Sequence, residues 1–205
     1  MVRALLDGSK TQTRRVLKPQ PDSHHWEMLP GYELKRSEIV TIDGHAAVKF
    51  AHSIPQNRSW DDACRWTLCP YGAPGGRLWV RETWSTHACF DDVPPAQLTT
   101  RSLHYWADGR IQTGKGRPSI HMPRWASRIT LEVTGVRVER LQAISDADAV
   151  AEGIGLTEQA IGVPMTIPAG TTMPRALYRT LWESINGAGS WELNPWVWCV
   201  SFRRA

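Results

Sequence analysis

Gly8-Ser9-Lys10-Thr11-Gln12-Thr13-Arg14-Arg15 is the stretch around which the rest of this sequence is organised. It places a lysine, two threonines and two arginines just after a glycine. Lys10 and Thr13 are three positions apart, and on a helical turn or a tight loop this spacing puts the amine and the hydroxyl on one face. An amine beside a hydroxyl can act as the base for a nucleophile, and Arg14 and Arg15 can hold a phosphate or an oxyanion. The alternative is a basic, solvated helix end.

Three segments, in order, resemble the ASCH family, small β-barrel domains related to the PUA fold. The pattern Gly8-x-Lys10-x-x-Thr13-x-Arg15 is similar to the family signature G-x-K-x-x-T-x-R. Residues 74–84, PGGRLWVRETW, resemble the "PGD-LWVRET" strand of larger phage and prophage members. The tail from Leu181 to Trp198 resembles theirs as well.

The resemblance covers most of the chain and is weakest over residues 20–65 and 155–172. It implies an α+β fold, a PUA-like β-barrel with a few short flanking helices. The length of 205 residues fits one domain, 1–205, and the inserted loops are expected at about 20–75, 85–125 and 155–172. The family usually has a strand before the first motif, so we expect the sheet to lack one edge strand here.

Composition narrows the class of protein. Eleven tryptophans can fill a core or supply flat faces for stacking bases, and a net charge of +4 permits a nucleic-acid partner without demanding one. No CxxC pair occurs; Cys64, Cys69, His87 and Cys89 can be imagined as a zinc site, but ordinary reduced cysteines fit better. No apolar run approaches the ~20 residues of a membrane span. We expect a soluble, cytoplasmic protein of a bacterium or a phage-infected cell, without metal or cofactor.

Periodicity and turn signals predict the main elements. The predicted strands and hairpins are a hairpin over 38–50 that turns at Asp43-Gly44, a strand over 78–83, a hairpin over 104–111, a strand over 129–141 with a bulge or bend at Gly135, and a strand over 195–202. The predicted helices cover 1–6, 144–153 and 174–186.

Two further groups are candidate binding residues. Trp79, Arg81 and Glu82 lie on the strand over 78–83 and are candidates for substrate binding; the alternative is that Arg81 pairs with a carboxylate and only closes the barrel. The second group mixes cations with an aromatic ring, which suits single-stranded nucleic acid because cations meet phosphates and rings stack on bases. It comprises Lys115, Arg117, Arg124, Trp125 and Arg128, and the alternative is a solvated loop.

Glu152 stands out on the helix over 144–153. Ser145 is the expected N-cap, Asp148 completes a capping box, and Gly153 ends the helix. Glu152 then lies at the helix C-terminus, where the helix dipole disfavours a carboxylate. This unfavourable position suggests a functional role.

The resemblance also implies a reaction. One branch of small ASCH proteins is known as N4-acetylcytidine amidohydrolases, which use a lysine, a threonine three residues on, and a glutamate near the end of the helix after the central strands. Lys10, Thr13 and Glu152 match these positions, Glu152 more loosely. In the implied mechanism Lys10 is the base, Thr13 attacks the acyl carbonyl, Arg15 or backbone N–H groups hold the oxyanion, and Glu152 orients Lys10 or passes a proton to the leaving amine.

Several alternatives stay open. This chain is about twice as long as those enzymes, and its insertions can reshape the pocket for another modified base or a polynucleotide. The chain can be a module that reads a modified or single-stranded base without hydrolysis, an ASCH-type ribonuclease, or a phage accessory protein that binds another protein. The sequence leaves open whether Glu152 or Glu82 is the working carboxylate.

Overall fold

The structure is a computed structural model that describes residues 1–20, 40–51, 64–98, 102–109, 114–154 and 170–205. Most of the predicted inserted loop over 155–172, and part of the one over 20–75, lie outside the described residues. Within the described part, no helix is long and apolar enough to cross a membrane.

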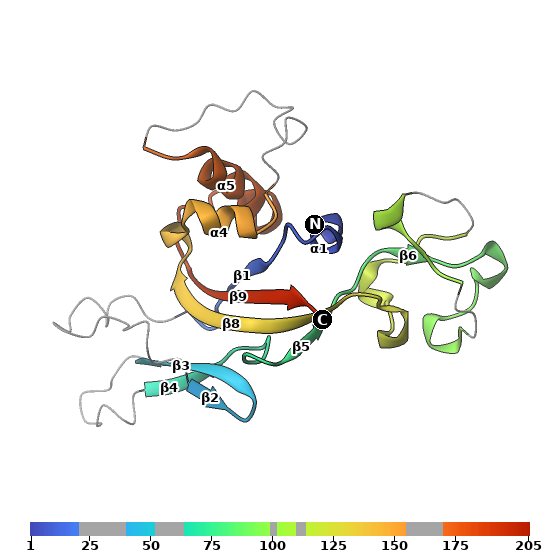
Figure 1. Ribbon diagram of the computed structural model, residues 1–205, viewed down its shortest axis with the longest axis horizontal. Helices are drawn as coiled ribbons and strands as arrows, with labels where there is room; N and C mark the ends of the chain where they lie inside the picture. Colours follow the sequence, from blue (N-terminus) through green and yellow to red (C-terminus); the bar gives the residue numbers. More distant parts are fainter. Residues whose placement is uncertain (21–39, 52–63, 99–101, 110–113, 155–169) are drawn as a thin grey trace.

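A curled antiparallel sheet forms the centre of the molecule (Figure 1). Its four strands are, in spatial order, β1 (Gln12–Val16), β9 (Trp196–Arg204), β8 (Thr130–Arg140) and β5 (Arg77–Trp79). The pairing of β8 with β9 shifts register between Val133 and Gly135, which confirms the bulge predicted at the glycine. A long strand that bends at a bulge lets the sheet curl, so the fold is α+β with a barrel-like sheet.

The two faces of β9 serve different cores because side chains alternate along a strand. Trp198, Val200 and Phe202 pack on one face, against a cluster that includes Leu5 and Ile129. The other face contributes Val197 and Cys199 to a second cluster. That cluster is completed by residues from the helices and their flanks: Leu141, Ile144, Ala149, Tyr178, Trp182 and Trp191.

Among the described residues, three α-helices flank the sheet: α1 (Val2–Leu6), α4 (Asp146–Ala151) and α5 (Met173–Asn186). All three predicted helices are confirmed, and in Figure 1 α4 and α5 lie together on one side of the sheet. Ser145 caps α4 as expected, since its hydroxyl accepts from the backbone N–H of Asp148 at 3.1 Å. Gly187 ends α5 with a φ of 96°.

The segment predicted as the first inserted loop contains a second sheet. Its strands are β2 (Val40–Ile42), β3 (His45–Ala51) and β4 (Cys64–Leu68). The predicted hairpin is confirmed: Asp43 and Gly44 connect β2 and β3 with φ values of 48° and 74°, as a tight two-residue turn requires. Strand β4 was not predicted, because its polar flanks read as loop.

The insertion over 85–125 folds around a small apolar cluster of Trp84, Leu98, Met122 and Ala126. Of the predicted hairpin over 104–111, the first arm is β7 (His104–Tyr105), which pairs with the distant β6 (Trp84–Ser85); the second arm, 110–111, lies outside the described residues. The rest of this lobe is built from short 3₁₀ turns, and one more follows β8. These are η1 (Ala88–Phe90), η2 (Pro95–Gln97), η3 (Trp106–Asp108), η4 (Ser119–His121), η5 (Arg124–Ala126) and η6 (Leu141–Ala143).

Candidate functional site

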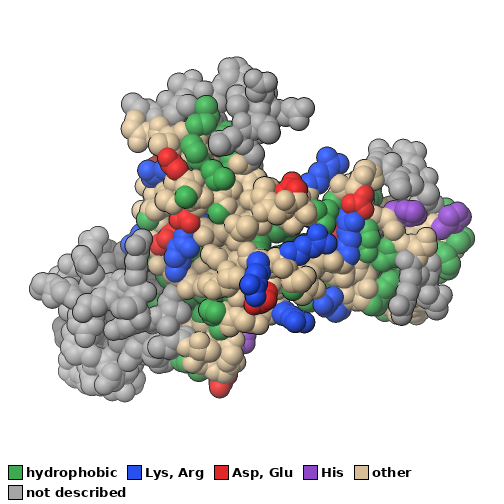
Figure 2. Space-filling model, in the orientation of Figure 1, with side chains coloured by type: hydrophobic (Ala, Val, Ile, Leu, Met, Phe, Trp, Pro, Cys, Tyr) green, Lys and Arg blue, Asp and Glu red, His purple; other side chains and the backbone are tan. Residues whose placement is uncertain are grey.

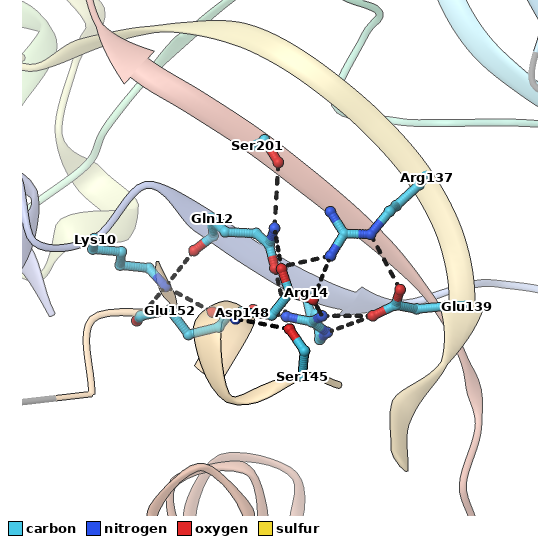
Figure 3. Close-up of polar contacts among 9 residues, drawn as sticks. All are labelled: Lys10, Gln12, Arg14, Arg137, Glu139, Ser145, Asp148, Glu152 and Ser201. Carbon is cyan, nitrogen blue, oxygen red and sulfur yellow. Dashed lines mark hydrogen bonds and ion pairs between the residues drawn. The ribbon is translucent and has the colours of Figure 1, made fainter. Parts of the chain in front are cut away.

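Lys10 and Glu152 form a buried ion pair (Figure 3). The Lys10 Nζ donates to Glu152 Oε2, to the backbone O of Glu152 and to the backbone O of Gln12, each at 2.8 Å. Both residues are only 5% exposed. The predicted association of Lys10 with Glu152 is confirmed. The charge of Lys10 offsets the unfavourable interaction of this carboxylate with the helix dipole at the end of α4.

Backbone contacts fix this pair. Lys10 and Glu152 form an isolated antiparallel bridge, and the backbone N–H of Lys10 donates to Ala4 O at 2.8 Å. Gly153 follows with a φ of 80°, and a Cβ there would stand 2.9 Å from the Cβ of Lys10. Only glycine allows both this conformation and this approach.

The structure corrects the expected arrangement of Lys10 and Thr13. The motif is not a helical turn or a tight loop: it runs as extended chain into β1, with Lys10, Gln12 and Arg14 buried and Thr13 half-buried. Side chains three positions apart on extended chain leave on opposite faces. Thr13 pairs across the sheet with Val200, whose side chain packs in the first core cluster. The amine of Lys10 is directed to Glu152 on the other face.

Arg14 is the centre of a charged network behind the pair (Figure 3). Its guanidinium donates to Glu139 Oε1 at 2.5 Å and to Gln12 Oε1 at 2.6 Å, and lies 3.2 Å from Asp148 Oδ2. Arg137 donates to Glu139 Oε2 at 3.1 Å and lies 2.8 Å from Asp148 Oδ2. With the Lys10–Glu152 pair, three cations oppose three carboxylates, so the buried charge is balanced.

Burial and charge together set the pKa values here. Burial lowers the pKa of Lys10, although the Glu152 carboxylate opposes this effect. Burial alone would raise the pKa values of Asp148 and Glu139. The hydrogen bond and charge of Arg137 nevertheless lower the pKa of Asp148 to about 2, and Arg14 and Arg137 lower the pKa of Glu139.

Two cavities meet at Glu152. The smaller, about 40 Å³, lies between β1 and α5, and the larger, about 380 Å³, lies between the end of α4 and α5. They share three lining residues, Met1, Glu152 and Leu181. The smaller one is also lined by Thr13, Arg14, Arg15, Val16, Tyr178, Trp182, Ile185 and Asn186. Thr13 and Glu152 both border this cavity, but the Thr13 side chain leaves β1 on the face opposite Glu152, which Lys10 supports from behind.

The second oxygen of the Glu152 carboxylate has no hydrogen-bond partner among the described residues, although it is buried. The guanidinium of Arg14 lies 3.5 Å from it, which is an ion-pair distance rather than a hydrogen bond. A buried carboxylate oxygen left with an open acceptor position beside a cavity can receive a proton or a ligand N–H.

Glu82 lies in a different cluster. It is buried and receives two hydrogen bonds from Arg128, at 2.9 and 3.0 Å. Arg128 also binds Asp108 and lies 4.0 Å from the ring centroid of Tyr105. Glu152, not Glu82, is the carboxylate that faces Lys10, and both Glu82 and Arg128 are engaged in joining the lobe of β6 and β7 to the sheet.

The remaining predicted binding residues fall into two groups. Arg117 is buried, and its guanidinium donates to Phe90 O at 2.6 Å. Arg81 and Arg124 are exposed and lie 4.6 and 5.8 Å from the ring centroid of Trp79. Trp125, 46% exposed, and Lys115 also reach solvent. Figure 2 shows lysine and arginine side chains gathered near the C-terminus and at the base of the lobe that holds β6.

Sequence reasoning missed several residues of the site. Gln12, Glu139 and Arg137 complete the charged network, and Tyr178 and Trp182 line the smaller cavity. The alternation of Lys10, Gln12 and Arg14 was an available signal, because a period of two places all three on one face of a strand. In the described part of the chain, no three His, Cys, Asp or Glu side chains are grouped so that they can hold a metal ion.

Comparison with known proteins adds no relative: no protein-family model, curated protein or solved structure matches this chain.

Proposed function

We propose that this protein is a hydrolase that removes the acyl group from an N4-acylated cytidine-type base, with Glu152 as its working carboxylate. The observation that carries the proposal is the buried Lys10–Glu152 pair, whose free carboxylate oxygen belongs to a cavity that Thr13 also lines. The resemblance of residues 8–15 to the ASCH signature supports the same chemistry.

The arrangement favours a specific division of roles. All three hydrogens of the Lys10 ammonium are taken by acceptors, so Lys10 positions Glu152 and offsets its charge, rather than acting directly on Thr13. Glu152 is then the proton carrier. In the proposed reaction, a water oxygen bonds to the acyl carbon, one water proton passes to Glu152, and the carbonyl oxygen becomes an oxyanion.

The rest of the reaction follows from the same groups. When the oxyanion collapses, the bond between the acyl carbon and N4 breaks, and Glu152 returns the proton to the leaving amine. This single displacement yields the carboxylic acid and the free amine, with Glu152 back in its starting state. The larger cavity has the volume of a small-molecule site and is where the base is expected to bind.

The test is incubation of the purified protein with N4-acetylcytidine, with acetate and cytidine measured as products. Stoichiometric release of both supports the proposal. An intact nucleoside after long incubation with folded protein would contradict the proposed reaction.

A second candidate is a module that binds RNA or single-stranded DNA without catalysis. Arg81 and Arg124 favour it, because both lie against the ring of Trp79 and neither has a carboxylate within 4 Å among the described residues. Two uncompensated guanidiniums beside an indole suit phosphates and a stacked base. Such a module would shift RNA mobility and leave both acetylated cytidine and RNA length unchanged, whereas a ribonuclease would shorten the RNA.

A further inference from the structure

Two residues that line the smaller cavity each hold a buried polar atom that lacks a hydrogen-bond partner among the described residues. One is Glu152 Oε1, and the other is the indole Nε1 of Trp182. Leaving a buried donor or acceptor unsatisfied costs about 1–3 kcal/mol, so proteins rarely do so without a reason. Here one acceptor and one donor are left open in the lining of the same cavity.

The packing of Trp182 holds its ring in place. The side chain is 4% exposed, lies on α5, and its ring centroid is 6.2 Å from that of Tyr178. Trp182 lies within α5, and its backbone O accepts from Asn186 Nδ2 at 3.0 Å. Because the ring is enclosed by the second core cluster, its N–H has little freedom to find another acceptor.

The chemistry of the two atoms defines what binds between them. An ionised carboxylate only accepts hydrogen bonds, and an indole N–H only donates. The ligand must therefore bring a donor for Glu152 and an acceptor for Trp182. A secondary amide carries both on adjacent atoms. The cavity of about 40 Å³ has room for a group of this size and not for a whole nucleoside. The rest of the nucleoside would bind in the larger cavity beside it, which is about 380 Å³.

We infer that the smaller cavity binds the scissile secondary amide, with its N–H donating to Glu152 Oε1 and its carbonyl oxygen accepting from Trp182 Nε1. This inference rests on the proposed function and adds Trp182 as a catalytic residue. As the carbonyl oxygen becomes an oxyanion, the hydrogen bond from the indole strengthens. Trp182 thereby takes the role that the sequence assigned to Arg15, whose side chain is exposed.

Trp182→Phe tests the role, because it keeps an aromatic ring and removes the N–H together with part of the indole, a loss of volume that the control below shares. We expect the kcat for acetate release from N4-acetylcytidine to fall about 100-fold, as for loss of one oxyanion donor. The matched control is Trp84→Phe, since Trp84 Nε1 is also buried without a partner but lies in the separate cluster around β6. This control should release acetate at the wild-type rate.

A second measurement does not depend on turnover or on the folding of the variant. The indole N–H resonances of ¹⁵N-tryptophan-labelled wild-type protein are assigned by triple-resonance NMR and followed while N-methylacetamide is added. A saturable downfield shift of the Trp182 indole proton, with Trp84 unmoved, supports the amide site. An unmoved Trp182 resonance overturns it, as does a Trp182→Phe protein that releases acetate within twofold of wild type. If the Trp182 resonance shifts and no acetate is released, the amide site stands and the proposed reaction fails.

Discussion

Lys10 Nζ lies 2.8 Å from both the side-chain Oε2 and the backbone O of Glu152, so one ammonium donates to one carboxylate oxygen and to the carbonyl oxygen at the end of α4. The two residues come from segments 142 positions apart, and the contact ties the start of β1 to the helix that follows β8. Removing one partner leaves the other as a buried charge without its principal counter-ion.

The first prediction concerns the stability of this pair. Lys10→Met should lower the free energy of unfolding by about 3 kcal/mol or more, because the Glu152 carboxylate stays buried. Adding Glu152→Gln should restore part of the loss, and urea unfolding of the four proteins measures the coupling. The exposed pair of Arg203 and Glu132 serves as the control, with an expected coupling of about 1 kcal/mol or less. Additive effects of Lys10→Met and Glu152→Gln would contradict this interpretation.

The close approach of Gly153 to Lys10 gives a second prediction. Gly153→Ala forces a Cβ into a left-handed conformation and to within 2.9 Å of the Lys10 Cβ. Gly187→Ala carries only the conformational cost, since nothing lies within 4 Å of its Cβ position. Both should destabilise the protein by about 1 kcal/mol or more, and Gly153→Ala by the larger amount. Equal melting temperatures for the two variants would show that the contact with Lys10 is unimportant.

A third prediction concerns acid stability. The pKa of Asp148 is lowered from 3.8 to about 2, so the folded state holds this carboxylate ionised more strongly than the unfolded chain does. The resulting stabilisation is present above pH 3.8 and is lost as the pH falls through about 2. Asp148→Asn should therefore show a shallower decline of unfolding free energy over this range than wild type, measured by urea titration at each pH. An unchanged slope for Asp148→Asn would contradict this assignment.

Much of the fold could be predicted from the sequence, because strong local signals coincide with it. The hydrophobic periodicity of α5, the caps of α4 and the bulge at Gly135 all rest on short-range rules. The pairing of β6 with β7 could not be predicted, because two-residue strands whose paired residues are 19 and 21 positions apart leave no periodic pattern.

The candidate site was predicted only in part. The association of Lys10 with Glu152 followed from the resemblance. The three-residue spacing of Lys10 and Thr13 predicted one shared face on a helical turn or tight loop, but this segment is extended chain, where the same spacing separates the faces. Arg117 and Arg128 looked like phosphate contacts by composition. Only tertiary structure shows that Phe90 O receives a hydrogen bond from Arg117 and that Glu82 pairs with Arg128.

The binding alternative leads to a fourth prediction. If Arg81 and Arg124 contact phosphates, replacing both with glutamine should weaken binding of single-stranded RNA and reduce the slope of log affinity against log salt by about 1.4, that is, about 0.7 for each contact. Arg179→Gln is the control, because Arg179 already pairs with Glu192 at 2.8 Å. Fluorescence anisotropy across a salt series measures both. RNA affinity that is indifferent to salt would count against a polynucleotide partner.

The most direct test of the central claim compares two buried glutamates that each pair with a cation. Glu152→Gln removes the carboxylate that lines the cavities, whereas Glu82→Gln removes one that binds Arg128 in the other cluster. The measurement is the rate of acetate release from N4-acetylcytidine by both folded variants and the wild type. We predict a loss of at least about 100-fold for Glu152→Gln and a rate within a few-fold of wild type for Glu82→Gln. Equal rates for Glu152→Gln and wild type would contradict the assignment of Glu152 as the working carboxylate.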